Sequence, residues 1–387
     1  MIQPPQPREM IAQLIALPSV SSLDPRRDMS NRAVAERLAE WLSSLGFACE
    51  LLPLPANPGK VNLLATLGQG PGGLVLAGHL DTVPFDEDGW DSDPFHATER
   101  EGRLYGLGTS DMKSFLALAI EAARPFAENP LAGRPLRQPL IILGTADEEI
   151  TLGGARALAA AGRPKARHAL IGEPTNLRPV RMHKGHLAES IRVRGRSGHS
   201  SNPALGLNAV EGMHRALKAL FAYRDALAEG SRHPAFEVPH ATLNPGCIHG
   251  GDAANRIPAQ CELKVELRFL PGDKVEALRT ELRGRAQAAL AGSGYGIEFE
   301  SLYPGCPAFE TPANAALVRA CEELTGHAAG AVDFATEGAI FNDMGLETVV
   351  LGPGSIDQAH QQNEYLALDR LEPTVALLRQ LIQRFCA

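Results

Sequence analysis

The chain of 387 residues lacks several features that would assign it to a class at once. No apolar run reaches the roughly 18 residues that a membrane-spanning helix needs. Residues 1–5 (MIQPP) lack the basic segment and apolar core of a signal peptide. The formal net charge is −8, and no basic block typical of nucleic-acid binding occurs. We therefore expect a cytoplasmic protein with no membrane segment and no nucleic-acid partner.

Cysteine is also scarce. The six cysteines are Cys49, Cys247, Cys261, Cys306, Cys321 and Cys386. None forms a CxxC pair, so the spacing argues against a disulfide framework and for reduced thiols. At these spacings they are also poor candidates for metal ligands.

The length suits two domains, and 44% hydrophobic with 21% charged residues is typical of a globular protein. Residues 1–182 and 304–387 show short apolar strands alternating with helices, which predicts an α/β domain. Residues 183–303 change to alternating strands with two long helical stretches, which predicts an inserted α+β domain of βαββαβ order. The strands expected in the α/β part are 49–54, 61–67, 74–77, 139–145, 168–171 and 348–351. The helices expected there are two within 8–45, then 114–128, 153–161, 314–324, 336–344 and 371–385.

A histidine and a carboxylate follow the expected strand 74–77. His79 and Asp81 are two residues apart, and on an extended backbone such residues point to the same side. A metal-binding imidazole is commonly oriented in this way, with one ring nitrogen on the ion and the other donating to a carboxylate. By itself the pair is a weak indication, because a strand-end histidine and a turn aspartate explain it more simply.

Acidic residues follow two further expected strands. Glu148 and Glu149 come directly after 139–145, and Glu173 follows 168–171. Adjacent carboxylates repel one another unless a cation lies among them, although a solvated turn is the simpler alternative. Sites in open α/β sheets form at the carboxyl ends of strands, which favours a site here. Asp111 precedes a clear helix, where an N-cap would also explain it.

Together with a histidine near the end of the chain, these residues form one candidate set. Its members are His79, Asp81, Asp111, Glu148, Glu149, Glu173 and His360. Two histidines with several carboxylates suit zinc, cobalt or manganese, and the set is large enough for two ions with one bridging carboxylate. If Glu148 or Glu149 binds metal, its neighbour can act as a general base.

The motifs around these residues carry a family resemblance over nearly the whole chain. They are, in order, GHLDTVP (78–84), WDSDPF (90–95), GLGTSDMK (106–113), TADEE (145–149), GEPT (172–175), RSGHSS (196–201), GGDAANRIP (250–258), LGPGS (351–355) and AHQQNEY (359–365). The chain resembles the M20 family of co-catalytic metallo-deacylases, and within it the acetylornithine deacetylase subfamily. The resemblance implies a phosphorylase/hydrolase-like di-metal catalytic domain with an inserted α+β dimerisation domain that acts as a lid.

The resemblance also implies the metal ligands. His79, Asp111 and Glu173 would bind one divalent ion, Zn²⁺ or Co²⁺. Asp111, Glu149 and His360 would bind the second, so that Asp111 bridges the two ions. A homodimer would carry two such ions in each subunit.

Further roles follow from the same resemblance. Asp81 would orient His79, and Glu148 would be the general base. The peptide bond between Asp111 and Met112 would be cis. His199, on the inserted domain, would reach the partner subunit's site and stabilise the tetrahedral oxyanion.

Four residues are expected to bind the substrate. Asn255 and Arg256 would meet its α-carboxylate, and the turn containing Gly354 would offer backbone groups. Glu337 is the candidate partner for a cationic side chain. Local alternatives remain for several of these residues. They are a loop histidine for His199, a turn residue for Asn255, a surface charge for Arg256 and a helix-start residue for Glu337.

The expected activity is hydrolysis of the small molecule N2-acetyl-L-ornithine to L-ornithine and acetate, a step of arginine biosynthesis. N-acetylcitrulline, another N-acyl amino acid or a dipeptide is the alternative substrate. A non-catalytic member of the fold that binds an amino acid is the alternative of another class. The chain departs from the subfamily at Gln362 and Asn363, where proline and aspartate are expected. This departure leaves His360 in place and bears on specificity only.

Overall fold

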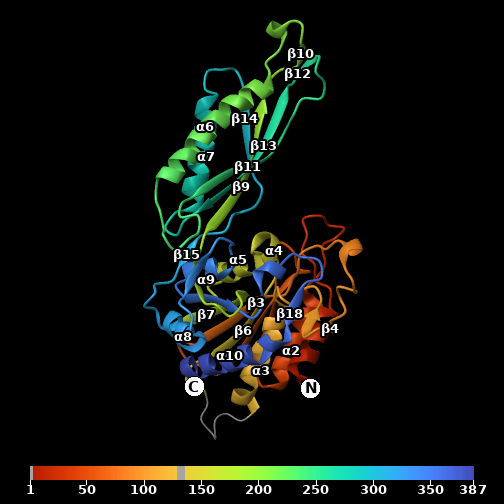
Figure 1. Ribbon diagram of the computed structural model, residues 1–387, viewed down its shortest axis with the longest axis vertical. Coiled ribbons are helices and arrows are strands. Elements are labelled where there is room, and N and C mark those ends of the chain that lie inside the picture. Colours follow the sequence, from red (N-terminus) through yellow and green to blue (C-terminus); the bar gives the residue numbers. More distant parts are fainter. Residues whose placement is uncertain (1–2, 129–135) are drawn as a thin grey trace. The chain divides into compact units, whose positions relative to one another are not determined.

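The structure, a computed structural model, describes residues 3–128 and 136–387, and the chain divides into two units (Figure 1). Unit 1 comprises Met1–Met182, Glu310–Gly330 and Thr336–Ala387. Unit 2 comprises His183–Phe309 and Ala331–Ala335. Both chain termini lie in unit 1.

A sheet with strand order β1-β2-β6-β3-β7-β17-β8 forms the centre of unit 1. Its strands are β1 (Ala48–Pro53), β2 (Val61–Leu67), β3 (Leu74–His79), β6 (Leu140–Thr145), β7 (His168–Pro174), β8 (Val180–His183) and β17 (Glu347–Gly352). β6, β3, β7 and β17 run parallel to one another, so their carboxyl ends share one edge. Every residue of β3, β6 and β7 is buried, as expected for parallel strands covered on both faces.

Helices pack on both faces of this sheet. One hydrophobic core unites residues of the strands with α1 (Pro7–Ile15), α2 (Arg32–Ser44), α3 (Lys113–Glu128), α8 (Ala316–Thr325) and α10 (Leu371–Phe385). On β7, a Cβ at Gly172 would lie 2.0 Å from the Phe115 ring, so α3 approaches the sheet more closely than a side chain there would allow. The preceding residue, Ile171, faces α9 (Gly338–Asp343) on the opposite side, and α5 (Gly153–Ala160) packs against α9.

A small sheet of order β18-β5-β4 lies beside the loop that leads into α3. Its strands are β4 (Thr98–Arg100), β5 (Arg103–Tyr105) and β18 (Tyr365–Ala367). Short 3₁₀ helices occur at Glu87–Gly89, Ile356–Gln358 and Leu368–Arg370. Because β18 pairs with β5, the segment after His360 is fixed next to the segment before Asp111.

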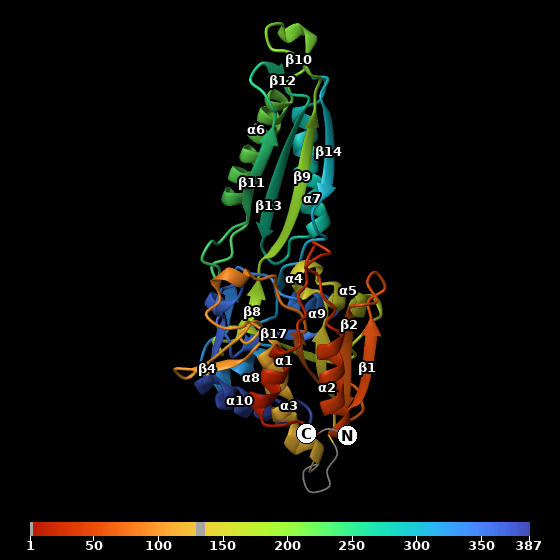
Figure 2. The same cartoon turned by 90° about the vertical axis from the view of Figure 1, so that its right-hand side faces the viewer.

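Unit 2 is an antiparallel sheet of order β11-β13-β9-β14, whose strands Figure 2 shows side by side. The strands are β9 (Gly185–Arg194), β11 (Thr242–Gly250), β13 (Gln260–Phe269) and β14 (Gly296–Ser301). Two helices, α6 (Ala209–Glu229) and α7 (Val275–Ala289), pack side by side on one face. β13 alternates buried and more exposed residues, so its apolar side chains face these helices. The loops at one end carry the short pair β10 (Gly198–His199) and β12 (Arg256–Ile257), and Pro203–Leu205 forms a 3₁₀ helix.

The boundary between the units differs from the expected one. The sequence predicted an insertion of residues 183–303, whereas 304–309 and 331–335 also belong to unit 2. His186 and Cys306 exchange both main-chain hydrogen bonds, at 3.0 and 2.8 Å, which holds the first segment. Lys184 Nζ lies 3.3 Å from Asp333 Oδ1, which holds the second. The short strands β15 (Phe309–Glu310) and β16 (Gly330–Val332) lie where the chain passes between the units.

The predicted α/β class of unit 1 is confirmed, and unit 2 has the predicted βαββαβ order of its main elements. The features that were not predicted include two close to the candidate residues. The acidic run continues into a short helix, α4 (Glu148–Thr151), and the segment 86–103 contains β4. None of the helices described in residues 3–128 and 136–387 is long and apolar enough to cross a membrane.

Candidate metal centre

The candidate residues of unit 1 gather at the shared carboxyl edge of the parallel strands. β3 ends at His79, β6 leads into Glu148 and Glu149, and β7 carries Glu173 near its end. One ligand atom each of His79, Glu148 and Glu173 lies within 4.8 Å of the others. The same holds for His79, Asp111 and Glu149. The sheet therefore brings residues that are far apart in the sequence into one cluster.

His79 is held so that one ring nitrogen faces this cluster. Its Nδ1 lies 3.0 Å from the main-chain oxygen of Asp81 and 3.9 Å from the nearest carboxylate oxygen of that residue. A carbonyl oxygen only accepts, so Nδ1 carries the proton and Nε2 of the neutral ring keeps its lone pair. Nε2 lies 3.0 Å from Asp111 Oδ1 and 3.8 Å from Glu173 Oε1. This is the tautomer that a metal-binding histidine needs.

Asp111 lies between the two histidines. While its Oδ1 faces His79, its Oδ2 lies 3.6 Å from His360 Nε2. His360 Nε2 is also 3.1 Å from Glu149 Oε2. One carboxylate therefore presents an oxygen to each side of the cluster, as a bridging ligand would. The peptide bond between Asp111 and Met112 is cis, which confirms that expectation.

The turn that carries Glu148 and Glu149 is held at its start. Asp147 has φ 55°, a left-handed conformation that aspartate tolerates better than most residues, and α4 begins immediately after it. The two carboxylate oxygens of Asp81 accept the main-chain N–H groups of Glu148 and Glu149, each at 3.3 Å. Asp81 thus contacts His79 through its backbone and the acidic turn through its side chain.

A buried lysine supports the same turn from behind. Lys60 Nζ lies 3.1 Å from Asp147 Oδ1 and 2.7 Å from Asp28 Oδ1, and it donates to Ser21 Oγ at 3.0 Å. Nearby, Asn62 Oδ1 accepts from the Ala146 main-chain N–H at 2.9 Å. Neither Lys60 nor Asn62 was predicted from the sequence. Both precede or begin an ordinary apolar strand, and nothing in their spacing indicates that they face the turn.

The electrostatics of the cluster favour a bound cation. Burial, reinforced by neighbouring carboxylates, raises the pKa of Glu148 and of Glu173 well above the ordinary value. The ion pairs of Asp111, Glu149 and Glu173 are with histidines. Glu149 Oε1 is buried and, among the described residues, without a hydrogen-bond partner. A buried group of carboxylates with an unpartnered oxygen and a histidine lone pair is a donor set that fits divalent metal ions.

Two further predicted residues of unit 1 lie near this edge. Glu337, at the start of α9, is 1% exposed, and among the described residues only the Thr145 hydroxyl acts on its carboxylate as a donor, without forming a hydrogen bond of ordinary geometry. Burial raises the pKa of Glu337 to about 7, and its charge acts on that of Glu148. Gly354 packs against Ser110, where a Cβ would lie 2.4 Å from the serine Oγ. Its main-chain oxygen accepts from Asn176 N at 2.7 Å.

The other predicted residues belong to unit 2, where they make local contacts at the β10–β12 pair. His199 Nδ1 accepts from the Ser201 main-chain N–H at 3.2 Å, so the neutral ring carries its proton on Nε2, free to donate. Arg256 forms an ion pair with Asp252 at 2.6 Å, and both side chains are more than half exposed. The main-chain oxygen of Asn255 accepts from Ser200 N at 3.1 Å.

The departure at positions 362 and 363 has a structural counterpart. Asn363 Oδ1 accepts from Asp91 N at 2.8 Å, and its Nδ2 lies 3.4 Å from Gly89 O. Asn363 has φ 57°, which asparagine adopts readily. The side chain therefore fastens the 89–91 loop to the segment that carries His360. Glu364, the next residue, was not predicted as a functional residue, although it lies within the AHQQNEY motif.

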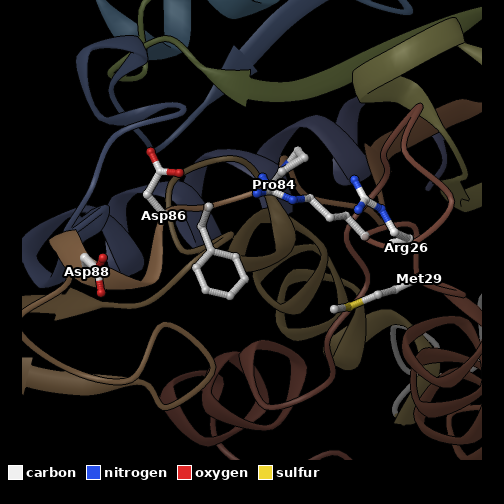
Figure 3. A pocket seen from close by; sticks show the side chains of 7 residues that line it. Arg26, Met29, Pro84, Asp86 and Asp88 are labelled. Carbon is white, nitrogen blue, oxygen red and sulfur yellow. The ribbon is translucent and has the colours of Figure 1, made fainter.

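A pocket of about 510 Å³ opens beside the loop that follows β3. Its lining consists of Arg26, Arg27, Met29, Pro84, Phe85, Asp86 and Asp88. Figure 3 shows Arg26 and Met29 on one side of this pocket and Asp86 and Asp88 on the other. None of the seven lining residues is a candidate metal ligand.

Solved structures share this fold at low sequence identity. An M20 family metallo-carboxypeptidase from Sulfolobus solfataricus superposes with a TM-score of 0.77 at 17% identity, covering 98% of this chain and 99% of the other. Aminopeptidase PepT from Bacillus cereus gives a TM-score of 0.75 at 20% identity, covering 97% of this chain and 98% of the other.

Curated relatives are much more similar in sequence. The acetylornithine deacetylase of Edwardsiella ictaluri is 49% identical over 374 residues, which is 96% of each chain. The acetylornithine deacetylase of Proteus mirabilis is 47% identical over 98% of this chain and 96% of its own. Residues 75–384 match the pattern of peptidase family M20/M25/M40. A match over most of the chain, together with relatives of this similarity, shows that the chain belongs to peptidase family M20/M25/M40.

Proposed function

We propose that this protein is a metal-dependent amidohydrolase that converts N2-acetyl-L-ornithine to L-ornithine and acetate, as a cytoplasmic step of arginine biosynthesis. The observation that carries the substrate is the similarity to full-length relatives named acetylornithine deacetylase at 46–49% identity. The buried cluster at the sheet edge supports the chemistry independently, because it assembles a donor set that fits two metal ions.

Two divalent ions, Zn²⁺ or Co²⁺, would occupy the cluster. His79, Asp111 and Glu173 would hold one ion, and Asp111, Glu149 and His360 the other. The two oxygens of Asp111, one facing each histidine, support a bridging role. When bound, such ions supply Lewis-acid polarisation of the amide carbonyl and make water a stronger acid.

Glu148 is the proposed general base. It takes a proton from the attacking water and returns it to the leaving nitrogen, so that its carboxylate is regenerated in each cycle. Burial favours this role because it raises the proton affinity of the carboxylate. Asp81 positions Glu148 through the main-chain amides at the start of α4 and contacts His79 as well.

The inserted unit would supply the remaining groups in a homodimer. His199, whose Nε2 is free to donate, stabilises the tetrahedral oxyanion in the partner subunit's site. Arg256 binds the α-carboxylate of the substrate with its planar guanidinium, and Asn255 assists. The turn at Gly354 contributes backbone groups from unit 1.

Glu337 is proposed to recognise the cationic side chain of ornithine. Its two oxygens are buried and, apart from the neighbouring Thr145 hydroxyl, without a hydrogen-bond donor among the described residues, so an ammonium group would satisfy them. A neutral substrate such as N-acetylcitrulline would gain much less from this carboxylate.

The test measures acetate release from N2-acetyl-L-ornithine and from N-acetylcitrulline, with the wild type and Glu337→Gln. We expect the wild type to prefer the ornithine substrate. We expect Glu337→Gln to lower kcat/KM on it by about 10- to 100-fold, the value of one or two charge-assisted hydrogen bonds. Activity on N-acetylcitrulline should change little.

The control is Glu323→Gln, which makes the same change at an exposed ion pair with Arg384. Equal losses on both substrates with Glu337→Gln would contradict the role of Glu337. A wild type that prefers N-acetylcitrulline, another N-acyl amino acid or a dipeptide would overturn the substrate. A wild type that releases nothing while binding an amino acid would overturn the activity.

A further inference from the structure

Glu364 is a buried carboxylate that the proposed mechanism does not use. It lies four residues after His360 and immediately before β18, and it is 1% exposed. Its side chain accepts three main-chain hydrogen bonds from one short loop. Oε1 accepts from Ser110 N at 2.7 Å and from Asp111 N at 2.9 Å, and Oε2 accepts from Gly108 N at 2.9 Å.

These contacts fix the loop that delivers Asp111 to the cluster. The main-chain oxygen of Glu364 adds a fourth bond, from Gly106 N at 3.0 Å, so the loop is bound from 106 to 111. Gly108 has φ 88°, which glycine adopts as readily as a negative φ, so the residue does not fix the loop conformation by itself. Leaving one buried N–H without an acceptor costs about 1–3 kcal/mol, so three amides make the loop conformation depend on this carboxylate.

Glu364 also fixes the other side of the cluster. His360 is 55% exposed and has φ 59°, so its own surroundings restrain it weakly. The segment that carries it is tied down at Glu364 and at Asn363, whose side chain binds Asp91 N. One residue therefore sets the positions of two proposed ligands, Asp111 and His360, on the same ion.

We propose that Glu364 is a positioning residue of the metal centre, which holds Asp111 and His360 together and so sets the affinity of the second ion without contacting it. The proposal rests on the two-metal site described above. In this role the Glu364 carboxylate is not itself a metal ligand, because it accepts hydrogen bonds from main-chain amides.

The experiment titrates metal-free protein with Co²⁺ in the absence of substrate, followed by calorimetry and by the visible absorption of the bound ion. Partners of this kind commonly contribute 10- to 100-fold to metal affinity. We expect Glu364→Gln, which keeps the shape but loses one acceptor, to weaken the second Co²⁺ by about that factor and to change its spectrum. We expect Glu364→Asp to retain part of the affinity. The control is Glu121→Gln, on α3, whose carboxylate pairs with Arg124 and Arg379.

Wild-type affinity and spectrum for both ions in Glu364→Gln would overturn the proposal. If that variant does not fold, hydrogen exchange of the metal-free wild type decides the matter. The amides of Gly108, Ser110 and Asp111 should be protected before metal is added, and unprotected exchange would overturn the proposal. Failure of the wild type to bind two ions would instead contradict the proposed metal site. Binding of two ions without hydrolysis of acetylornithine would contradict only the proposed activity.

Discussion

The sheet edge of unit 1 and the β10–β12 tip of unit 2 both carry residues proposed to act in one reaction, yet they are built in opposite ways. At the sheet edge, Glu148 and Glu173 are largely withdrawn from solvent and their neighbours are fixed by main-chain contacts. At the tip, His199 and Arg256 are exposed and make only local contacts.

The difference fits two distinct roles, metal binding at the sheet edge and contact with a substrate or a second subunit at the tip. Buried charges need a rigid surrounding and a cation, because burial of unpaired carboxylates is costly. Groups that meet a substrate or a second subunit can remain exposed until that encounter, because water solvates them in the meantime. Substitutions at the sheet edge should therefore affect metal binding and the chemical step. Substitutions at the β10–β12 tip should lower the reaction rate without changing the stability of the fold.

The largest effect is expected for Glu148→Gln. The variant keeps the shape of the side chain but cannot accept the proton, so kcat on acetylornithine should fall by about 10³-fold. Metal content, measured by elemental analysis, should stay at the wild-type level. Glu36→Gln, an exposed position on α2, is the control. Near-normal turnover in Glu148→Gln would contradict its assignment as the general base.

A smaller loss is expected for His199→Ala. Removing one donor to an oxyanion lowers kcat by about 10²-fold, whereas the midpoint of thermal unfolding should not change because the side chain is exposed. Mixing this variant with Glu148→Gln tests the subunit arrangement. Subunit exchange should restore activity, because a mixed dimer contains one site with both functional residues. Absence of recovery despite verified exchange would place His199 outside the partner subunit's site.

The smallest effect concerns metal removal, and it should fall on one unit. Ions that bind only the folded state stabilise it by about 2.7 kcal/mol at a concentration 100 times Kd. Chelation should therefore lower the stability of unit 1 and increase hydrogen exchange around 79–81 and 147–149. Exchange in β9 and β13 of unit 2 should stay the same. Equal destabilisation of both units would contradict the expectation that the metal ions stabilise unit 1 alone.

Much of this arrangement could be predicted from the sequence, for identifiable reasons. The strand ends could be predicted because buried parallel strands appear in the sequence as short apolar runs. Residues of the types that bind metal follow these runs, as His79 and Glu173 do. The supporting contacts could not be predicted. Lys60 and Asp147 are 87 positions apart, and only the packed sheet brings the lysine behind the acidic turn. The assignment of residues 331–335 to unit 2 could not be predicted for a similar reason, since they join it through the tertiary contact between Lys184 and Asp333.

The insertion of unit 2 within unit 1 has a consequence for synthesis of the chain. A ribosome completes the contiguous segment His183–Phe309 before it has made β17, His360 or Glu364. Unit 2 can therefore close its core while unit 1 still lacks a central strand and the segment that carries His360, since domains tend to fold as their residues emerge. The carboxylates of Asp111 and Glu149 spend that interval without His360. Completion of the second metal position is thus tied to the segment that carries His360 and Glu364, which follows unit 2 in the chain.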